Sequence, residues 1–258
     1  MSESVRNPVM FLDTNVLYGE LSCDLFLTLG ESHLVNWDVK WSDYALDELR
    51  EHLTERIRAL YPNLSDEKVL GRVSRRLYAM KTYLPQACVL EWRRVVDDVR
   101  GMVADVDDAP ILAGAVAAAA DYLVTSNVGD FDIPTIARRL RITVRKPGDM
   151  LCTIFESDKE FSTAALTGML DSHRRPPRSL RELCSMLRTM PELSAFSVLL
   201  ENEARARAES ASLSSRRPPY SHALQPRDSR GRFARKPVVG DDDLDLYDAI
   251  WGIDGNFK

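Results

Sequence analysis

The sequence predicts an α/β fold: a three-layer sandwich with a five-stranded, mainly parallel sheet between two layers of helices. From residue 9 to residue 152, short apolar runs alternate with segments whose apolar residues are spaced by three and four. The runs are apolar along their whole length, as in strands that are buried on both faces of a parallel sheet. Beyond residue 153 this alternation stops and only helical patterns continue.

The elements follow in order along the chain. Extended segments are expected at residues 9–12, 33–41, 88–90, 122–125 and 142–144. Helices are expected at residues 16–29, 43–60, 65–83, 111–120 and 133–140, with another beginning at Pro147. Ser42 or Asp43 is the expected N-cap of the second of these helices.

The pattern divides the chain into three parts. Residues 1–152 form the expected α/β domain, and residues 153–209 form a small helical C-terminal extension. Residues 210–258 are rich in Ser, Arg, Pro and Gly, and they cannot bury enough apolar surface to offset the entropy of ordering. We expect this last part to be a disordered tail, basic at first and acidic towards its end.

Bulk properties restrict the class of protein. No apolar run approaches the roughly 20 residues of a membrane span, and residues 1–8 are too short and polar for a signal peptide. The four cysteines are scattered without a CxxC pair, which argues against a zinc site or a disulfide framework. We therefore expect a cytoplasmic protein with no membrane partner. The net charge of -5 argues against a non-specific nucleic-acid binder, although it averages over segments of opposite sign.

Four acidic residues lie where a parallel sheet binds its ligands. Asp13 directly follows the first strand, and Asp130 lies just past the fourth. Asp108 begins the helix that leads into the fourth strand, and Glu48 lies off the apolar stripe of the helix after the second. Ligands of open parallel sheets bind beyond the carboxyl ends of the strands, and all four side chains can reach that edge.

Each acid also has a purely structural interpretation. Asp13 alone, or the pair Asp107 and Asp108, could be ordinary helix caps, residues 127–130 an ordinary turn, and Glu48 a solvated side chain. The functional interpretation depends on their joint occurrence. Clustered carboxylates repel unless a cation neutralises them, and hard oxygen ligands favour Mg²⁺ or Mn²⁺ over zinc. Such an ion activates water and stabilises charge on a phosphate, which predicts phosphodiester hydrolysis.

Several sequence segments resemble the motifs of the PIN-domain ribonuclease family, in the family's order and spacing. They are FLDTNVL at 11–17, WSDYALDEL at 41–49, DDAPILAGA at 107–115, ADYLVTSNVGDF at 120–131 and KPGDML at 146–151. Each motif alone is weak, whereas the set is specific. The resemblance covers residues 9–152.

The resemblance implies an endoribonuclease that depends on Mg²⁺, with Mn²⁺ as the alternative ion. It implies catalytic roles for Asp13, Glu48, Asp108 and Asp130. The residues implied to hold the metal are Asp13, Asp108 and Asp130, and those implied to support the site are Asn15, Thr125 and Asn127.

The fourth motif departs from the usual pattern. Many PIN domains have an aspartate two residues after the threonine, where this chain has Asn127. The subfamily that it resembles most combines this asparagine with the aspartate of a following Asp-Phe pair, here Asp130. The fourth acidic position is therefore 130 or 127, and we predict Asp130.

Bacterial PIN domains of this size resemble the VapC-type toxins of toxin–antitoxin modules. The resemblance implies cleavage of structured RNA, tRNA or rRNA, and inhibition by a small cognate antitoxin, with a homodimer as a further expected assembly. The helical part of the extension, residues 157–209, resembles more loosely the C-terminal region of a longer toxin subgroup.

Other classes fit the sequence less well. Phosphatases of the haloacid-dehalogenase type need a second aspartate where this chain has Asn15, and a Rossmann dehydrogenase needs a GxGxxG turn after Leu12. A response-regulator receiver needs its acids and lysine in a different order. The alternative that stays open is a catalytically silent PIN-fold module that binds RNA or protein.

Basic residues indicate where RNA phosphates would bind. The candidates are Arg72, Arg75, Arg76, Lys81, Arg93, Arg94, Arg138, Arg139, Arg141, Arg145 and Lys146. For any one of them, a solvated surface charge is the alternative interpretation.

Overall fold

A computed structural model describes residues 6–31, 37–172, 177 and 179–214 of the chain. The expected extended stretch at 33–41 lies partly outside these ranges, and its described part forms a strand. Residues 210–214, expected to begin the disordered tail, instead form the end of the last helix. The rest of that expected tail, 215–258, lies outside the described residues.

A five-stranded parallel sheet forms the centre of the molecule. Its strands are β1 (Val9–Leu12), β2 (Asp38–Ser42), β3 (Cys88–Val89), β4 (Tyr122–Val124) and β5 (Thr143–Arg145). They lie in the order β3-β2-β1-β4-β5, and every neighbouring pair is parallel. The predicted α/β class with a five-stranded parallel sheet is confirmed. All four residues of the central strand β1 are buried, as expected for a strand covered on both faces.

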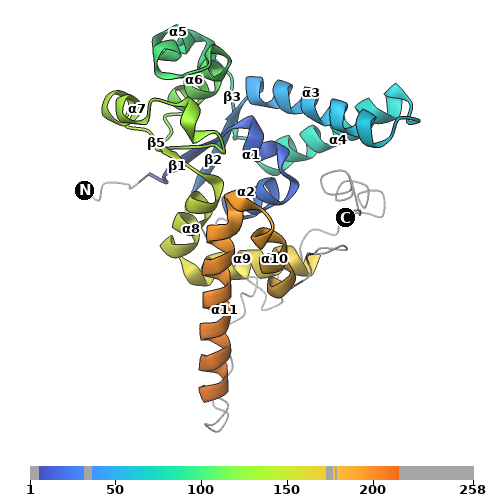
Figure 1. Cartoon of the computed structure of the whole chain (residues 1–258), viewed down its shortest axis with the longest axis vertical. Helices are drawn as coiled ribbons and strands as arrows, with labels where there is room; N and C mark the ends of the chain where they lie inside the picture. Colours follow the sequence, from blue (N-terminus) through green and yellow to red (C-terminus); the bar gives the residue numbers. More distant parts are fainter. Residues whose placement is uncertain (1–5, 32–36, 173–176, 178, 215–258) are drawn as a thin grey trace, which may run out of the picture.

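Helices cover both faces of the sheet (Figure 1). Their bounds are α1 (Thr14–Tyr18), α2 (Glu20–Glu31), α3 (Asp43–Leu60), α4 (Asp66–Tyr83), α5 (Val96–Val99), α6 (Ala109–Ala117), α7 (Ile133–Leu140), α8 (Pro147–Ser157), α9 (Lys159–Ser172), α10 (Leu180–Arg188) and α11 (Ser194–Ser214). Helix α6 contacts β1, β2 and β4, and α7 contacts β5. Helices α2 and α8 contact each other on the opposite side of the strands.

Short 3₁₀ turns link these elements. They are η1 (Glu91–Arg94), η2 (Arg100–Met102), η3 (Val106–Asp108), η4 (Val128–Asp130) and η5 (Pro191–Leu193).

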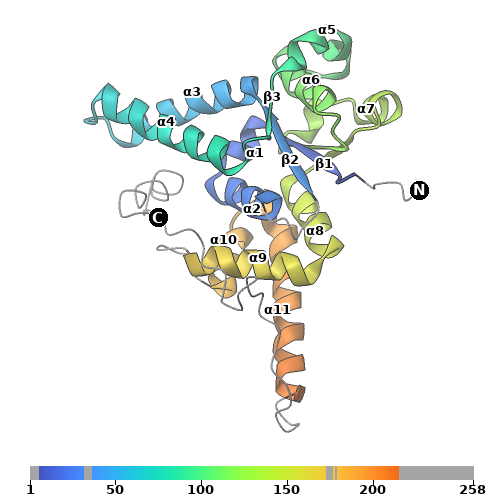
Figure 2. The ribbon, with the colours of Figure 1, turned by 180° about the vertical axis from the view of Figure 1, so that it is seen from behind.

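Helix α3 begins and folds as its sequence predicts. The Ser42 hydroxyl accepts a hydrogen bond from the Ala45 backbone N–H at 3.1 Å, so Ser42 is the N-cap. The apolar stripe Ala45, Leu46, Leu49, Leu53 and Ile57 is buried. Helices α3 and α4 contact each other and project as a hairpin from the sheet, as both views show (Figure 2). The other side of α3 is thereby free to present polar side chains at the edge of the sheet.

The C-terminal extension packs against one helical layer. Within the described part of residues 153–214 the elements are helical. Helix α9 contacts α2 and α8, and α11 contacts α8. Phe155 and Phe196 pack edge to face with centroids 6.0 Å apart, joining α8 to α11. The expected boundary at residue 152 falls inside α8. Within the described ranges, none of the helices combines the length and apolar character needed to cross a bilayer.

The strand order creates a switch point beside β1. From β1 the chain continues to β2 on one side, whereas it returns to β4 on the other. The connections therefore diverge beyond the carboxyl ends of β1 and β4, and such a divergence leaves room for a ligand. Close packing of α6 on β1 fixes this region, because a Cβ atom at Gly114 would lie 2.8 Å from Cε2 of the buried Phe11 ring.

The contact at Gly114 yields a stability prediction. Gly114→Ala should lower the free energy of unfolding by about 1–3 kcal/mol, because the fully buried Phe11 ring cannot move aside without strain. Gly71→Ala in α4 is the matched control, since no atom lies within 4 Å of its added Cβ. That control should be neutral or stabilising by about 0.5–1 kcal/mol. Urea unfolding measures both, and equal stabilities would contradict the tight α6–β1 contact.

Candidate functional site

Asp13 is a buried carboxylate at the end of the central strand. Its backbone N–H donates to the Val124 carbonyl at 3.0 Å, so the pairing of β1 with β4 continues one residue beyond the strand. Its side chain is 5% exposed and accepts hydrogen bonds from Thr125 Oγ1 and Asn15 Nδ2, both at 2.6 Å. Asp13 occupies the N-cap position of α1 but forms no side-chain capping bond. Helix capping therefore does not explain its burial.

Two of the predicted supporting residues hold Asp13 directly. Thr125 Oγ1 donates to the carboxylate and accepts from Asn15 Nδ2 at 3.1 Å and from the Asn127 backbone N–H at 3.0 Å. Asn15 Oδ1 in turn accepts from the Ser126 backbone N–H at 3.0 Å. This network ties the segment after β1 to the segment after β4. Asn127 contributes its backbone, and this residue is exposed.

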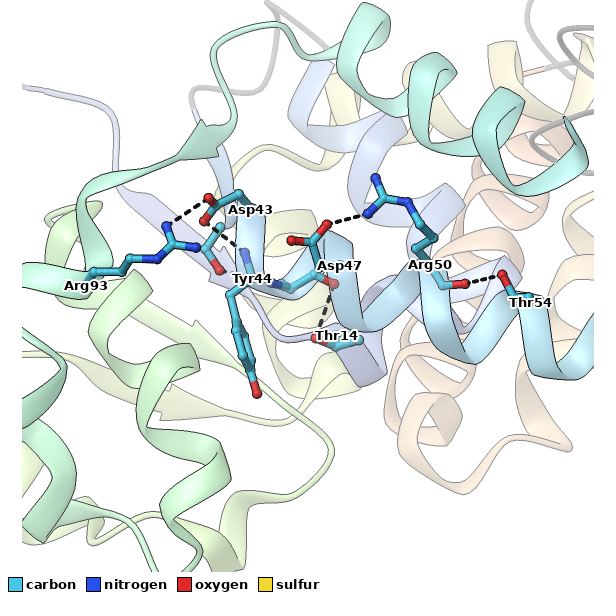
Figure 3. Close-up of polar contacts among 9 residues, drawn as sticks. Thr14, Asp43, Tyr44, Asp47, Arg50, Thr54 and Arg93 are labelled. Carbon is cyan, nitrogen blue, oxygen red and sulfur yellow. Dashed lines mark hydrogen bonds and ion pairs between the residues drawn. The ribbon is translucent and has the colours of Figure 1, made fainter. Parts of the chain in front are cut away.

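Glu48 is aimed at the same edge of the sheet. Its Oε2 atom accepts a hydrogen bond from Thr14 Oγ1 at 2.7 Å, and the residue is half-buried. In Figure 3, Thr14 lies against the first turns of α3. Glu48 is therefore not a freely solvated side chain. Sequence reasoning missed Thr14, because a threonine in the first turn of a helix gives no signal of what its hydroxyl contacts.

Asp108 and Asp130 end two neighbouring 3₁₀ turns, η3 and η4. The chain before η3 is bound to the end of η4, because the Ala104 N–H donates to the Asp130 carbonyl at 2.7 Å and Val103 pairs with Phe131. Asp108 is half-buried at the N-cap position of α6 and, like Asp13, forms no side-chain capping bond. Helix capping thus fails to account for its carboxylate as well.

Electrostatics links the predicted acids. Burial is the largest cause that raises the pKa of Asp13 to about 6, and the charge of Glu48 adds to it. The pKa of Asp108 is also raised to about 6. Burial is the largest cause, and the negative charges of nearby acids raise it further: Asp13, Asp130, Asp105 and Glu48. None of the ion pairs between described residues involves Asp13 or Asp108. Carboxylates that repel one another without a neutralising partner are chemically suited to a cation.

The geometry is nevertheless more open than a complete metal site. Among the described residues, no three His, Cys, Asp or Glu side chains converge closely enough to hold a metal ion as they stand. The acids interact electrostatically across the site. Carboxylate oxygens are hard ligands, which suit Mg²⁺ or Mn²⁺ better than zinc.

The structure corrects one candidate for RNA binding. Arg76 is fully buried, and its Nη2 atom donates to the Leu17 carbonyl at 2.9 Å. Its charge lies near the buried side chain of Asp24, so it ties α4 to α2 and cannot bind a phosphate at the surface. Burial raises the pKa of the Asp24 carboxyl well above its ordinary value, and the charge of Arg76 opposes this shift only in part.

The remaining basic candidates lie in different places. Arg72 stacks on Tyr61, Arg93 on Trp92, and Arg94 pairs with Glu91 at 2.8 Å. The other candidates are exposed: Arg75, Lys81, Arg138, Arg139, Arg141, Arg145 and Lys146. Arg145 ends β5, and its carbonyl accepts from the Thr125 N–H at 3.0 Å. Arg145 and Lys146 therefore flank the acidic edge, whereas Arg138, Arg139 and Arg141 precede β5 at the opposite edge.

Comparisons with protein-family models, with curated proteins and with solved structures find no match to this chain.

The raised pKa of Asp13 yields a prediction for the metal-free protein. The pKa of Asp13 in the folded state, about 6, exceeds the ordinary carboxyl pKa of 3.8. Between pH 3.8 and about 6, the folded state therefore binds more protons than the unfolded state. The free energy of unfolding should therefore fall as the pH rises from about 4 to about 6. Asp13→Asn should flatten that slope, and Asp98→Asn, an exposed change on α5, should not. Denaturant titrations in EDTA at several pH values measure the difference, and parallel wild-type and Asp13→Asn profiles would contradict it.

Proposed function

We propose that this chain is a divalent-metal-dependent endoribonuclease of the PIN type. One observation supports it most: the buried carboxylate of Asp13 lies at the switch point between β1 and β4, and it forms none of the ion pairs between described residues. Glu48 and Asp108 interact with it electrostatically. The sequence motifs of residues 9–152 resemble those of PIN domains, and this resemblance indicates the type of reaction, metal-dependent hydrolysis of RNA.

The residues of the site suit distinct tasks. Asp13, Asp108 and Asp130 would hold Mg²⁺ or Mn²⁺, which when bound lowers the pKa of water and stabilises charge on a phosphate. Thr125 and Asn15 donate hydrogen bonds to Asp13, and these bonds favour its ionised form and fix its orientation.

Glu48 is suited to move a proton. Its carboxylate is held by the Thr14 hydroxyl and faces the acidic edge, so it can orient a water and accept a proton from it. Arg145 and Lys146, exposed beside Thr125, can contact phosphates of the RNA flanking the cleaved bond. In-line attack of water on the phosphorus would then break one P–O bond without a covalent enzyme intermediate.

The biological assignment rests on the motif resemblance. On this basis we propose that the chain is the toxin of a toxin–antitoxin module and cleaves structured RNA, tRNA or rRNA, in the cytoplasm. Its expected partners are the RNA substrate, a small cognate antitoxin and a second copy of the chain.

A second candidate function is a PIN-fold module that binds RNA or protein without hydrolysing it. The absence of a ready three-ligand group among the described residues, together with Asn127 at a position that is acidic in many PIN domains, favours this candidate. The two functions separate in one assay: cleavage of RNA that requires Mg²⁺ or Mn²⁺ and stops on chelation occurs only if the chain is an enzyme.

The carboxylates yield a catalytic prediction. Asp13→Asn and Asp108→Asn should each reduce metal-dependent RNA cleavage to the background rate, because each removes a negative charge from the acidic site. The fold should persist in Asp13→Asn, since the amide oxygen of the new side chain can still accept from Thr125 and Asn15. Glu48→Gln should behave similarly, and Asp130→Asn compared with Asn127→Ala should show which position supplies the fourth acid.

These variants can be assayed with a fluorescently labelled RNA and circular dichroism. Asp149→Asn, an exposed change on α8, is the matched control and should cleave at the wild-type rate. Wild-type cleavage by both Asp13→Asn and Asp108→Asn would end the proposal.

Metal binding yields a thermodynamic prediction. Millimolar Mn²⁺ should raise the melting temperature, because an ion that binds the folded state stabilises it by about 2.7 kcal/mol at a hundredfold excess over Kd. Asp13→Asn should abolish the shift, while Asp149→Asn should keep it. Differential scanning calorimetry measures the shift, and the same shift in Asp13→Asn would place the ion elsewhere.

A further inference from the structure

Tyr44 lies in the first turn of α3, between the two parts of the acidic site. Its ring packs edge to face on Trp92, with centroids 5.3 Å apart and an interplanar angle of 64°. Trp92 belongs to η1, which contacts α6. The Tyr44 ring therefore lies between α3, which contains Glu48, and η1, which packs on α6. Asp108 ends η3, the turn that directly precedes α6.

The Tyr44 hydroxyl lies between both parts. It donates to the Asp107 carbonyl at 3.3 Å. The Glu48 carboxylate lies close enough for its charge to raise the pKa of Tyr44. The hydroxyl thus connects α3 to the segment that contains Asp107, about 60 residues further along the chain. Burial, followed by the negative charge of Glu48, raises the pKa of Tyr44, so the hydroxyl keeps its proton and remains a donor.

A separate set of contacts fixes the direction of the ring. Asp43 accepts from Trp92 Nε1 at 2.6 Å and from the Tyr44 backbone N–H at 2.9 Å. Arg93 donates to the other carboxylate oxygen of Asp43 at 3.1 Å and stacks over Trp92 at 4.5 Å. In Figure 3, the Asp43–Arg93 pair lies on one side of Tyr44, and the ring points away from α3. The ring cannot swing without disturbing η1.

We propose that Tyr44 is a positioning residue whose hydroxyl sets the placement of Glu48 relative to the turn that contains Asp108. This inference rests on the proposed function, because it assigns a residue that organises the same site. Asp107 precedes Asp108, so a hydrogen bond to the Asp107 carbonyl orients the backbone from which the Asp108 carboxylate extends. A neutral hydroxyl can link these two segments without adding a further negative charge to the site.

Tyr44→Phe tests the hydroxyl alone, because phenylalanine keeps the ring contact with Trp92. Partners that act through a neighbouring ligand typically affect metal affinity or activity by about 10–100-fold. We expect a weakening of apparent Mn²⁺ affinity and a fall in kcat for RNA cleavage within that range, with KM for RNA unchanged. The metal-free melting temperature should stay within a few degrees of the wild type.

Amide hydrogen exchange provides a second readout without metal or RNA. The Asp107 and Asp108 amides donate to Asp105, and they should exchange faster in Tyr44→Phe than in the wild type. Tyr78→Phe is the matched control, since Tyr78 is 64% exposed on α4, and it should leave every readout unchanged.

The outcomes separate the two proposals. A wild type that cleaves RNA with Mn²⁺, alongside a Tyr44→Phe variant with the same Mn²⁺ affinity, kcat and amide exchange, would overturn the role of Tyr44 alone. A rise in KM with kcat and Mn²⁺ affinity unchanged would also overturn it, because the hydroxyl would then contact substrate. A wild type that neither responds to Mn²⁺ nor cleaves RNA would overturn the proposed function and the positioning role with it.

Discussion

A negative charge buried at the end of a parallel strand is the constraint on which this molecule depends. Asp13 cannot leave the sheet edge, because its backbone continues the pairing of β1 with β4. Its side chain receives hydrogen bonds from Thr125 and Asn15, and a backbone hydrogen bond of Thr14 also favours its ionised form, yet burial still raises its pKa to about 6. The other buried acid described above, Asp24, also has a pKa raised by burial, but the charge of Arg76 acts on it in the opposite direction. A protein tolerates an unmatched buried carboxylate at a cost in stability, and such costs are concentrated at functional sites.

The rest of the fold brings further acids towards that charge. The reversal of strand order at β1 opens the edge where Asp13 lies, and the pairing of the chain around residues 103 and 131 brings η3 and η4 together. The cap at Ser42 sets where α3 begins, and this places Glu48 in reach of Thr14. The resulting site is a set of carboxylates that repel one another, with hydrogen-bond donors around Asp13. In the proposed function, a divalent cation would relieve this repulsion.

Local patterns predicted the elements, but long-range contacts decided their arrangement. The apolar runs and the cap at Ser42 located strands and helices well, whereas strand order depends on crossovers that no local pattern encodes. The short turns of residues 91–108 have no periodicity to detect, so the bridge through Trp92 was not predictable. Arg76 was predicted wrongly as a surface residue. Its spacing from Val69, Val73 and Met80 already placed it on the buried stripe of α4, and that signal could have located it.

The central claim is that the unmatched charge of Asp13 exists to bind a divalent metal ion. Anomalous diffraction from crystals grown with Mn²⁺ tests it most directly, because the signal locates the ion independently of activity. The account predicts one peak at oxygen-ligand distance, about 2.0–2.2 Å, from the carboxylates of Asp13 and Asp108. Crystals with Mn²⁺ bound at other residues, or with Asp13 still without an ion at millimolar Mn²⁺, would contradict it.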